Sequence, residues 1–145
     1  MRPTPLYNLI GFLSAPVLYG LYRLRAKGKE NLPEGGFVLA SNHVSSLDPW
    51  VVGMPLWPKR FLRFMAKSEL YWWPLKSVLN AVGAFPVRRG QRDTEAIETA
   101  VGLAREGYAV TMFPEGTRRT KGLVKRFESR PRSGAARIAE LEASL

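Results

Sequence analysis

Apolar and polar segments alternate along most of the chain in a pattern that predicts strands alternating with helices. Short apolar runs between turn residues predict buried strands at residues 37–41, 61–66, 84–88 and 108–113, with a further candidate at 25–32. Longer segments predict helices at residues 47–56, 68–82, 93–106 and 133–145. This alternation predicts an α/β fold with a mainly parallel sheet flanked by helices. In such folds, functional residues gather at the carboxyl ends of the strands.

The segment 93–106 is the clearest helix prediction. Its alanine, isoleucine and valine side chains fall on one face, Asp93 is placed to cap its start, and Gly107 stands where a helix-ending glycine belongs. The predicted helix at 68–82 contains the aromatic cluster Tyr-Trp-Trp at residues 71–73. Such a cluster packs in a core or sits at a membrane interface, and the sequence favours neither.

An apolar segment of 20 uncharged residues, 3–22, precedes the predicted sheet domain. It is about long enough to cross a bilayer, but its prolines, glycines and flanking tyrosines are more typical of a segment that lies in the membrane interface. Four basic residues follow it closely: Arg23, Arg25, Lys27 and Lys29. We therefore expect a membrane-associated hydrophobic helical segment at 1–24 and a single domain at 25–145. The alternative is a helix buried in the protein's own core.

Composition narrows the chemistry that the chain can perform. A length of 145 residues, 46% of them apolar, suits one folded domain with one core. The absence of cysteine excludes disulfides, Cys-ligated zinc and a thiolate nucleophile, and a single histidine excludes a multi-His metal site. A net charge of +10 favours an anionic partner: nucleic acid, an acidic lipid surface, a phosphorylated substrate or an acidic carrier protein.

The only histidine, His43, is followed five residues later by Asp48, across a predicted strand-to-helix turn. Asp48 is placed to accept a hydrogen bond from one ring nitrogen, which leaves the other nitrogen able to take a proton from a hydroxyl group. Ser45 and Ser46 are candidate nucleophiles, but neither lies in a Gly-x-Ser-x-Gly turn. Direct attack of a substrate hydroxyl on an acyl group is therefore the simpler mechanism. A purely structural histidine is the alternative.

Arginines follow two of the predicted strands. The strand at 108–113 runs into the sequence FPEGTRR, and the strand at 84–88 ends in two arginines. Because the planar arginine fork matches phosphate oxygens and glycine lets the backbone approach closely, we expect a phosphate site where these strand ends converge. Glu115 either orients an arginine, accepts a hydrogen bond from a substrate hydroxyl, or forms a structural ion pair.

Three motif blocks, taken in order, resemble the glycerolipid acyltransferase family that includes 1-acylglycerol-3-phosphate acyltransferases. NHVSSLD at 42–48 matches the Asn-His-x4-Asp block of that family. GAFPVRR at 83–89 matches its glycine-containing strand that ends in arginine, and FPEGTRR at 113–119 matches its Phe-Pro-Glu-Gly-Thr-Arg block. The resemblance extends over residues 32–119.

The resemblance implies an O-acyltransferase of phospholipid synthesis. The acyl donor would be acyl-CoA or acyl carrier protein, the acceptor 1-acylglycerol-3-phosphate, and the product phosphatidic acid, with no metal or redox cofactor. His43 would be the catalytic base and Asp48 its partner. The residues implied to shape the glycerol phosphate site are Arg89, Glu115, Gly116, Thr117 and Arg118. With the apolar N-terminal segment, the expected location is an anionic membrane surface on its cytoplasmic face.

The sequence departs from the family pattern after residue 126, where a fourth block with a Val-Pro-x-x-Pro-like pattern is missing. The chain therefore resembles a truncated or altered version of a longer enzyme. The alternative functions are acylation of glycerol-3-phosphate or another lysolipid, and a catalytically impaired, basic membrane-binding fragment. Nucleic-acid binding is disfavoured, because the basic residues lack a helix-turn-helix, zinc-finger or aromatic RNA-binding pattern.

Overall fold

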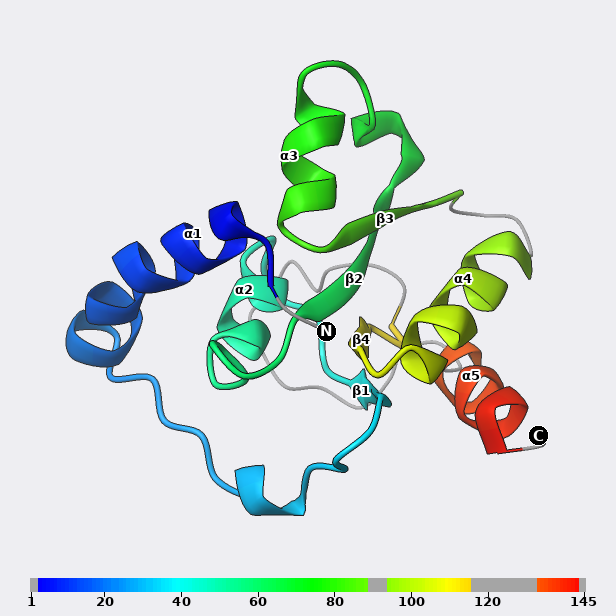
Figure 1. Cartoon of the computed structure of the whole chain (residues 1–145), viewed down its shortest axis with the longest axis horizontal. Coiled ribbons are helices and arrows are strands. Elements are labelled where there is room, and N and C mark those ends of the chain that lie inside the picture. Colours follow the sequence, from blue (N-terminus) through cyan, green and yellow to red (C-terminus); the bar gives the residue numbers. More distant parts are fainter. Residues whose placement is uncertain (1–2, 89–93, 116–132, 144–145) are drawn as a thin grey trace.

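Strands and helices alternate along the chain, as predicted (Figure 1). The computed structural model describes residues 3–88, 94–115 and 133–143. The helices are α1 (Pro5–Ala15), α2 (Asp48–Gly53), α3 (Leu75–Ala81), α4 (Thr94–Arg105) and α5 (Gly134–Ala143), with a π-helical turn at Pro16–Leu21 and 3-10 turns at Lys29–Asn31 and Ser68–Leu70. The strands in these ranges are β1 (Phe37–Ala40), β2 (Leu62–Lys67), β3 (Ala84–Val87) and β4 (Ala109–Met112).

The four strands form one parallel sheet in the order β1-β4-β2-β3. Ala109 of β4 pairs with Phe37 of β1 on one side and with Leu62 of β2 on the other. The first and last of the described strands are thus neighbours in space, with an expected separation of about 4.8 Å. This order brings the segments that follow β1 and β4 side by side.

Helices cover both faces of the sheet, as a parallel sheet requires (Figure 1). On one face, α4 and α5 contribute to a core built around Phe85, Val101, Val110 and Ile138. On the other face, a second core contains Phe37, Leu56, Leu62 and Ala109, with Val52 of α2 packed against it. The sheet is therefore held between two apolar layers, and its strand ends are fixed in position.

Helix α4 confirms the amphipathic pattern seen in the sequence. Ala96, Ala100, Val101 and Ala104 are buried on its sheet-facing side. The helix is followed by Gly107, whose φ of 88° is the left-handed conformation that glycine adopts without strain. The chain then enters β4 directly. The predicted cap Asp93 lies outside the described residues.

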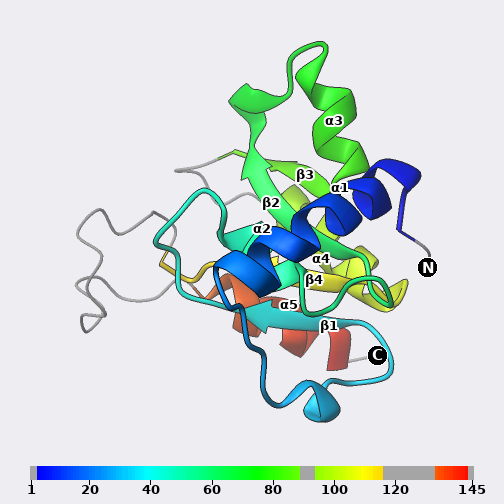
Figure 2. The ribbon, with the colours of Figure 1, turned by 90° about the vertical axis from the view of Figure 1, so that its left-hand side faces the viewer.

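Helix α1 is capped by Thr4, whose Oγ1 accepts the backbone N–H of Tyr7 at 3.1 Å. One side of the helix is fixed to the domain. Trp57 donates from Nε1 to Asn8 Oδ1 at 3.1 Å, and its ring packs directly on Gly11, where a Cβ would lie 2.7 Å from the indole. Figure 2 shows α1 crossing in front of β2 and α2.

The opposite side of α1 is exposed and apolar. Leu9, Phe12 and Leu13 have exposed fractions of 53%, 68% and 63%. Segment 3–22 is thus only partly buried: one side of α1 packs against the domain and the opposite side is exposed. In the part of the chain that the structure describes, helices are too short or too polar to span a membrane.

Two predicted elements differ in the structure. Residues 25–32 form no strand, because Gly28 takes a left-handed φ of 79° and a 3-10 turn follows it. The single helix predicted at 68–82 is interrupted, and α3 begins only after Pro74. Proline disfavours helical backbone at the residue before it, so the chain at 71–73 stays outside any helix.

The C-terminal helix contributes more to the core than its sequence suggests. The sequence gives α5 little apolar area, yet Ile138 is fully buried in the core shared with α4 and the sheet. Helix α5 packs against both α4 and β1. Ile138 thus joins Val101 and Ala104 of α4 in one core on this face of the sheet.

Candidate active site

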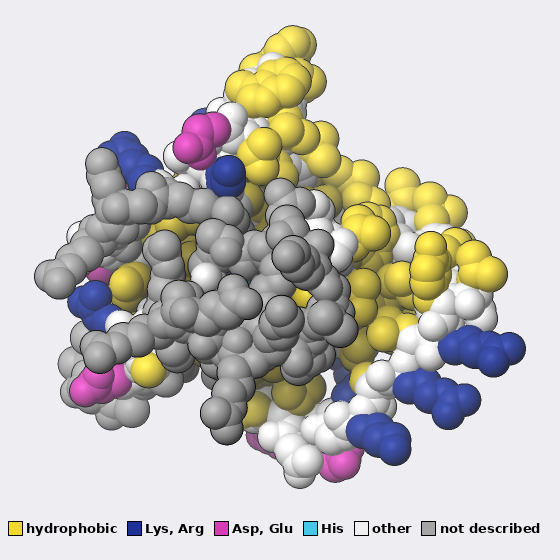
Figure 3. Space-filling view, turned by 180° about the vertical axis from the view of Figure 1, so that it is seen from behind, with side chains coloured by type: hydrophobic (Ala, Val, Ile, Leu, Met, Phe, Trp, Pro, Cys, Tyr) yellow, Lys and Arg dark blue, Asp and Glu magenta, His cyan; other side chains and the backbone are white. Residues whose placement is uncertain are grey.

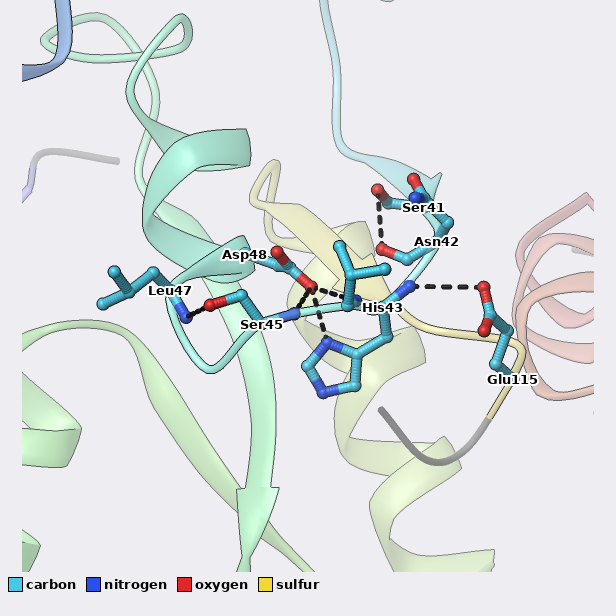
Figure 4. Close-up of polar contacts among 8 residues, drawn as sticks. Ser41, Asn42, His43, Ser45, Leu47, Asp48 and Glu115 are labelled. Atoms are coloured by element: carbon cyan, nitrogen blue, oxygen red, sulfur yellow. Dashed lines mark hydrogen bonds and ion pairs between the residues drawn. The ribbon is translucent and has the colours of Figure 1, made fainter. Parts of the chain in front are cut away.

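His43 lies just after β1, and its ring meets Asp48 at the start of α2 (Figure 4). The distance from His43 Nδ1 to Asp48 Oδ2 is 2.8 Å, so the hydrogen bond predicted from the spacing of these residues is present. An ionised carboxylate at this position accepts a hydrogen bond from Nδ1–H, which selects the tautomer with a lone pair on Nε2. Nε2 points away from Asp48 in Figure 4.

Asp48 also organises the backbone of the turn between β1 and α2. Its Oδ2 accepts the N–H groups of Val44 at 2.7 Å and Ser45 at 2.8 Å. Burial acts to raise the pKa of the Asp48 carboxyl, but hydrogen bonds from the Ser45 backbone, the His43 ring and the Val44 backbone outweigh it and hold that pKa below its usual value. The carboxylate therefore stays ionised at neutral pH.

Replacing Asp48 with asparagine should lower the melting temperature at neutral pH, because a neutral amide accepts these three hydrogen bonds less strongly. The pKa of Asp48 is lower in the folded than in the unfolded chain. Its contribution to stability is therefore complete above the unfolded value of about 4 and is lost as the pH falls through the lower folded value. The difference in melting temperature between wild type and Asp48→Asn should shrink as the pH is lowered to about 3.

Glu98→Gln provides the control for a change of net charge. Glu98 is exposed on α4, on the far side of the sheet from this turn, and its replacement also removes one acidic group. Melting curves of the three proteins across this pH range separate the local effect from the general one. A difference for Asp48→Asn that does not change with pH would contradict the role given to the carboxylate.

Residues after β4 complete the surroundings of His43. Phe113 stacks on the imidazole with ring centroids 4.2 Å apart and an interplanar angle of 21°. Glu115 Oε1 accepts the backbone N–H of His43 at 3.3 Å. The His43 side chain is only 9% exposed, so its orientation is fixed by Asp48, Phe113 and the strand below.

The other predicted site residues fall partly outside the described chain. Arg89, Gly116, Thr117 and Arg118 belong to ranges that the structure does not describe. Arg88 is exposed after β3, which lies at the opposite edge of the sheet from β1. Among the described residues, no group of three or more His, Cys, Asp and Glu side chains is placed to hold a metal ion.

An apolar pocket of about 170 Å³ lies between α1, α2 and the sheet. Ser46 and Leu47, which separate His43 from Asp48 along the chain, line it together with Trp50 and Trp57. Sequence reasoning missed this pocket and the stacking of Phe113. The pocket exists because α1 is docked against α2, where Trp50 Nε1 donates to Ser14 Oγ across a sequence separation of 36 residues. Phe113 had a sequence signal, since it ends the apolar strand immediately before Glu115.

The fold and the site define an α/β domain with a histidine–aspartate pair at the carboxyl edge of a parallel sheet, beside an apolar pocket. The sequence matches the family model described as Acyltransferase over residues 23–143. The chain therefore belongs to the acyltransferase family.

Proteins similar to this chain come from bacteria and plants. It is 35% identical over 123 residues to 1-acyl-sn-glycerol-3-phosphate acyltransferase of Bacillus subtilis (strain 168), covering 81% of this chain and 57% of that protein. It is 28% identical over 116 residues to the chloroplastic 1-acyl-sn-glycerol-3-phosphate acyltransferase LPAT1 of Arabidopsis thaliana, covering 77% of this chain and 32% of that protein. The chain thus spans 57% of the length of the first relative and 32% of the length of the second.

A solved structure shares the fold. The crystal structure of the 1-acyl-sn-glycerophosphate acyltransferase PlsC from Thermotoga maritima matches with a TM-score of 0.57 and 22% identity. The match covers 94% of this chain and 69% of that one. The α/β arrangement described above is therefore one that a solved acyltransferase also adopts.

Proposed function

We propose that the protein is an O-acyltransferase that transfers a fatty acyl group from a thioester to the free hydroxyl of 1-acylglycerol-3-phosphate, giving phosphatidic acid. The observation that carries this proposal is the 2.8 Å contact between His43 and Asp48 beside an apolar pocket. The pair supplies a base for a hydroxyl group, and the pocket supplies a place for a hydrocarbon chain. The relatives named 1-acyl-sn-glycerol-3-phosphate acyltransferase support the choice of acceptor.

In the proposed reaction, His43 Nε2 takes the proton of the acceptor hydroxyl as its oxygen attacks the thioester carbonyl. The carbon–sulfur bond then breaks, the ester forms, and the proton passes from His43 to the departing thiolate. Asp48 remains ionised throughout and stabilises the imidazolium that forms between the two steps. Each turnover releases one thiol and one ester, and no metal or redox cofactor takes part.

The acceptor's phosphate is assigned to the segments that follow β3 and β4. Arginine side chains offer paired donors to phosphate oxygens, and Arg89 and Arg118 are the candidates, with Gly116 and Thr117 giving close backbone and hydroxyl contacts. Support comes from the strand order, because β2 alone separates β3 from β4. The two ends are then about 10 Å apart, a distance that long arginine side chains bridge.

The apolar pocket is assigned to an acyl chain. Its wall is formed by indole rings and aliphatic side chains, and Ser46 and Leu47 bring its rim next to the His43 turn. A hydrocarbon chain placed there removes apolar surface from water on both partners, worth about 0.8 kcal/mol for each buried methylene. The donor is an acyl thioester of coenzyme A or of an acyl carrier protein, and the net charge of +10 suits both anionic carriers.

Attachment to a membrane is assigned to residues 3–22. The outer side of α1 is apolar and exposed at Leu9, Phe12 and Leu13. Exposed basic residues follow it, among them Arg23 and Arg25, and each contributes about 1 kcal/mol beside an anionic lipid surface. We place this surface on the cytoplasmic face, where acyl thioesters are made.

The test is an acylation assay of the purified chain in detergent micelles containing lysophosphatidate. With acyl-CoA or acyl carrier protein as donor, we expect phosphatidate to form together with an equal amount of free thiol. Monoacylglycerol, which lacks the phosphate, should give a lower kcat/KM. Faster acylation of glycerol-3-phosphate would move the function to that acceptor. Hydrolysis of the thioester without acylation of any of the three would contradict the proposal.

A further inference from the structure

Two consecutive tryptophans protrude from the segment between β2 and α3. Trp73 is 85% exposed and Trp72 58% exposed, and the neighbouring Leu70 is 42% exposed. We call Leu70, Trp72 and Trp73 the tryptophan tip. It stands away from the sheet at the far end of α3 (Figures 1 and 2). Tryptophan is rarely left in water to this extent, because each ring offers 150–250 Å² for burial.

The tip is held in a defined direction rather than being a loose loop. The Tyr71 side chain turns inward, whereas those of Trp72 and Trp73 are exposed. Its hydroxyl oxygen is buried, and burial raises the pKa of Tyr71 to about 12 despite the nearby positive charge of Arg63. Strand β2 ends three residues before Leu70, and α3 starts directly after Pro74. The outward position of the two indoles is therefore a feature of the folded domain.

The tip continues the apolar surface of α1. The start of α1 is joined to the end of α3 by a hydrogen bond from Thr4 Oγ1 to the carbonyl oxygen of Ala81 at 2.5 Å. Val78 of α3, which lies between the tip and this hydrogen bond along the chain, is 44% exposed. Figure 3 shows apolar side chains extending from the tip down to α1 on one face of the molecule. Helix α3 of seven residues spans only about 10 Å, so the tip at its other end lies a short distance from the start of α1.

The basic residues next to this apolar surface indicate which kind of partner it binds. Basic side chains lie next to the apolar surface (Figure 3), and Arg23, Arg25 and Lys27, which follow the π-helical turn after α1, are exposed. Lys67 and Lys76 flank the tip in the sequence and are exposed, as is the acidic residue Glu69 between them. Tryptophan flanked by lysine is the combination found at membrane interfaces, where the indole sits among headgroups and the ammonium meets lipid phosphates.

We infer that Trp72 and Trp73 insert into an anionic phospholipid surface as a second membrane contact, separate from α1. This inference rests on the membrane attachment of α1 proposed above. A helix alone leaves the domain free to rotate about the helix axis. A second contact at the far end of α3 removes that freedom and fixes the height and tilt of the strand ends above the lipid. The acceptor lipid then meets His43 in one orientation.

The absence of cysteine makes a direct test possible, because one introduced cysteine carries a single label. A polarity-sensitive fluorophore is placed on Leu70→Cys at the tip, on Leu13→Cys at α1, and on Glu98→Cys at the exposed side of α4. Each protein is mixed with phosphatidylcholine vesicles, with and without phosphatidylglycerol. We expect a blue shift at positions 70 and 13 that is larger with phosphatidylglycerol, and no shift at position 98.

The double substitution Trp72→Ser and Trp73→Ser then separates the two contacts. It should abolish the shift at position 70, keep that at position 13, and weaken vesicle binding in a sedimentation assay at least about tenfold. A label at position 70 that stays in water while position 13 shifts would overturn the inference and leave the attachment of α1 intact. If neither shifts, the attachment itself fails. A shift at position 70 that appears with rising protein concentration and no lipid would assign the tip to a second copy of the chain.

Discussion

Replacing His43 with alanine should lower the turnover number at least about 100-fold, the lower end of the contribution of a general base. The chain has no second histidine to replace it, and the ring is the group that Asp48 and Phe113 position. The lost interaction is one made with the proton during its transfer in the transition state. The turnover number kcat should therefore fall, while the KM for the acyl donor changes little. Initial rates of thiol release at saturating lysophosphatidate measure the effect.

Loss of a purely structural histidine would also reduce activity if it unfolded the turn. A further measurement is therefore needed to separate the two roles. The His43 side chain is 9% exposed, and removal of the ring leaves a space beside Phe113 of the size of imidazole. Added imidazole should therefore restore part of the turnover of His43→Ala, more strongly as the pH rises and neutral imidazole increases. Near-normal turnover of His43→Ala, or an unchanged rate with imidazole in a folded variant, would rule out the role of base.

The parts of the site that are local in sequence could be predicted, and the non-local parts could not. The contact between His43 and Asp48 spans five residues and a turn, and their spacing alone anticipated it. The hydrogen bond from the His43 backbone N–H to Glu115 depends on β4 lying beside β1. Strand order is decided by how whole helices pack on the sheet, which no local pattern encodes. The interpretations of Glu115 from sequence therefore omitted this partner.

The fold, too, was predictable where the signal is local in sequence and less so elsewhere. Short apolar runs predicted all four described strands to within about two residues, because burial on both faces leaves a continuous apolar signal. The helix at 68–82 was predicted too long, since its apolar content outweighed the effect of Pro74 on the residue before it. That error concealed the exposed tryptophans, which look like core residues when they are read as one side of a helix.

The stability of the whole arrangement should depend strongly on one glycine at the entrance to β1. Gly36 lies directly against the backbone of α4, and a Cβ there would overlap the carbonyl oxygen of Ala104. The obstacle is helical backbone rather than a flexible side chain, so α4 as a whole or the start of β1 must move. Gly36→Ala should therefore lower the free energy of unfolding by about 3 kcal/mol, the upper end of the usual cost of overpacking.

The neighbouring residue supplies the control. A Cβ at Gly35 meets nothing within 4 Å, so Gly35→Ala changes the same loop without a clash. We expect the melting temperature of Gly36→Ala to fall by about 10 °C and that of Gly35→Ala to stay within about 2 °C of the wild-type value. Because Phe37 begins the strand that leads to His43, the displaced strand should also reduce turnover at temperatures where Gly36→Ala is still folded. Equal melting temperatures for the two variants would show that α4 shifts freely, and that the packing of β1 against it does not position the site.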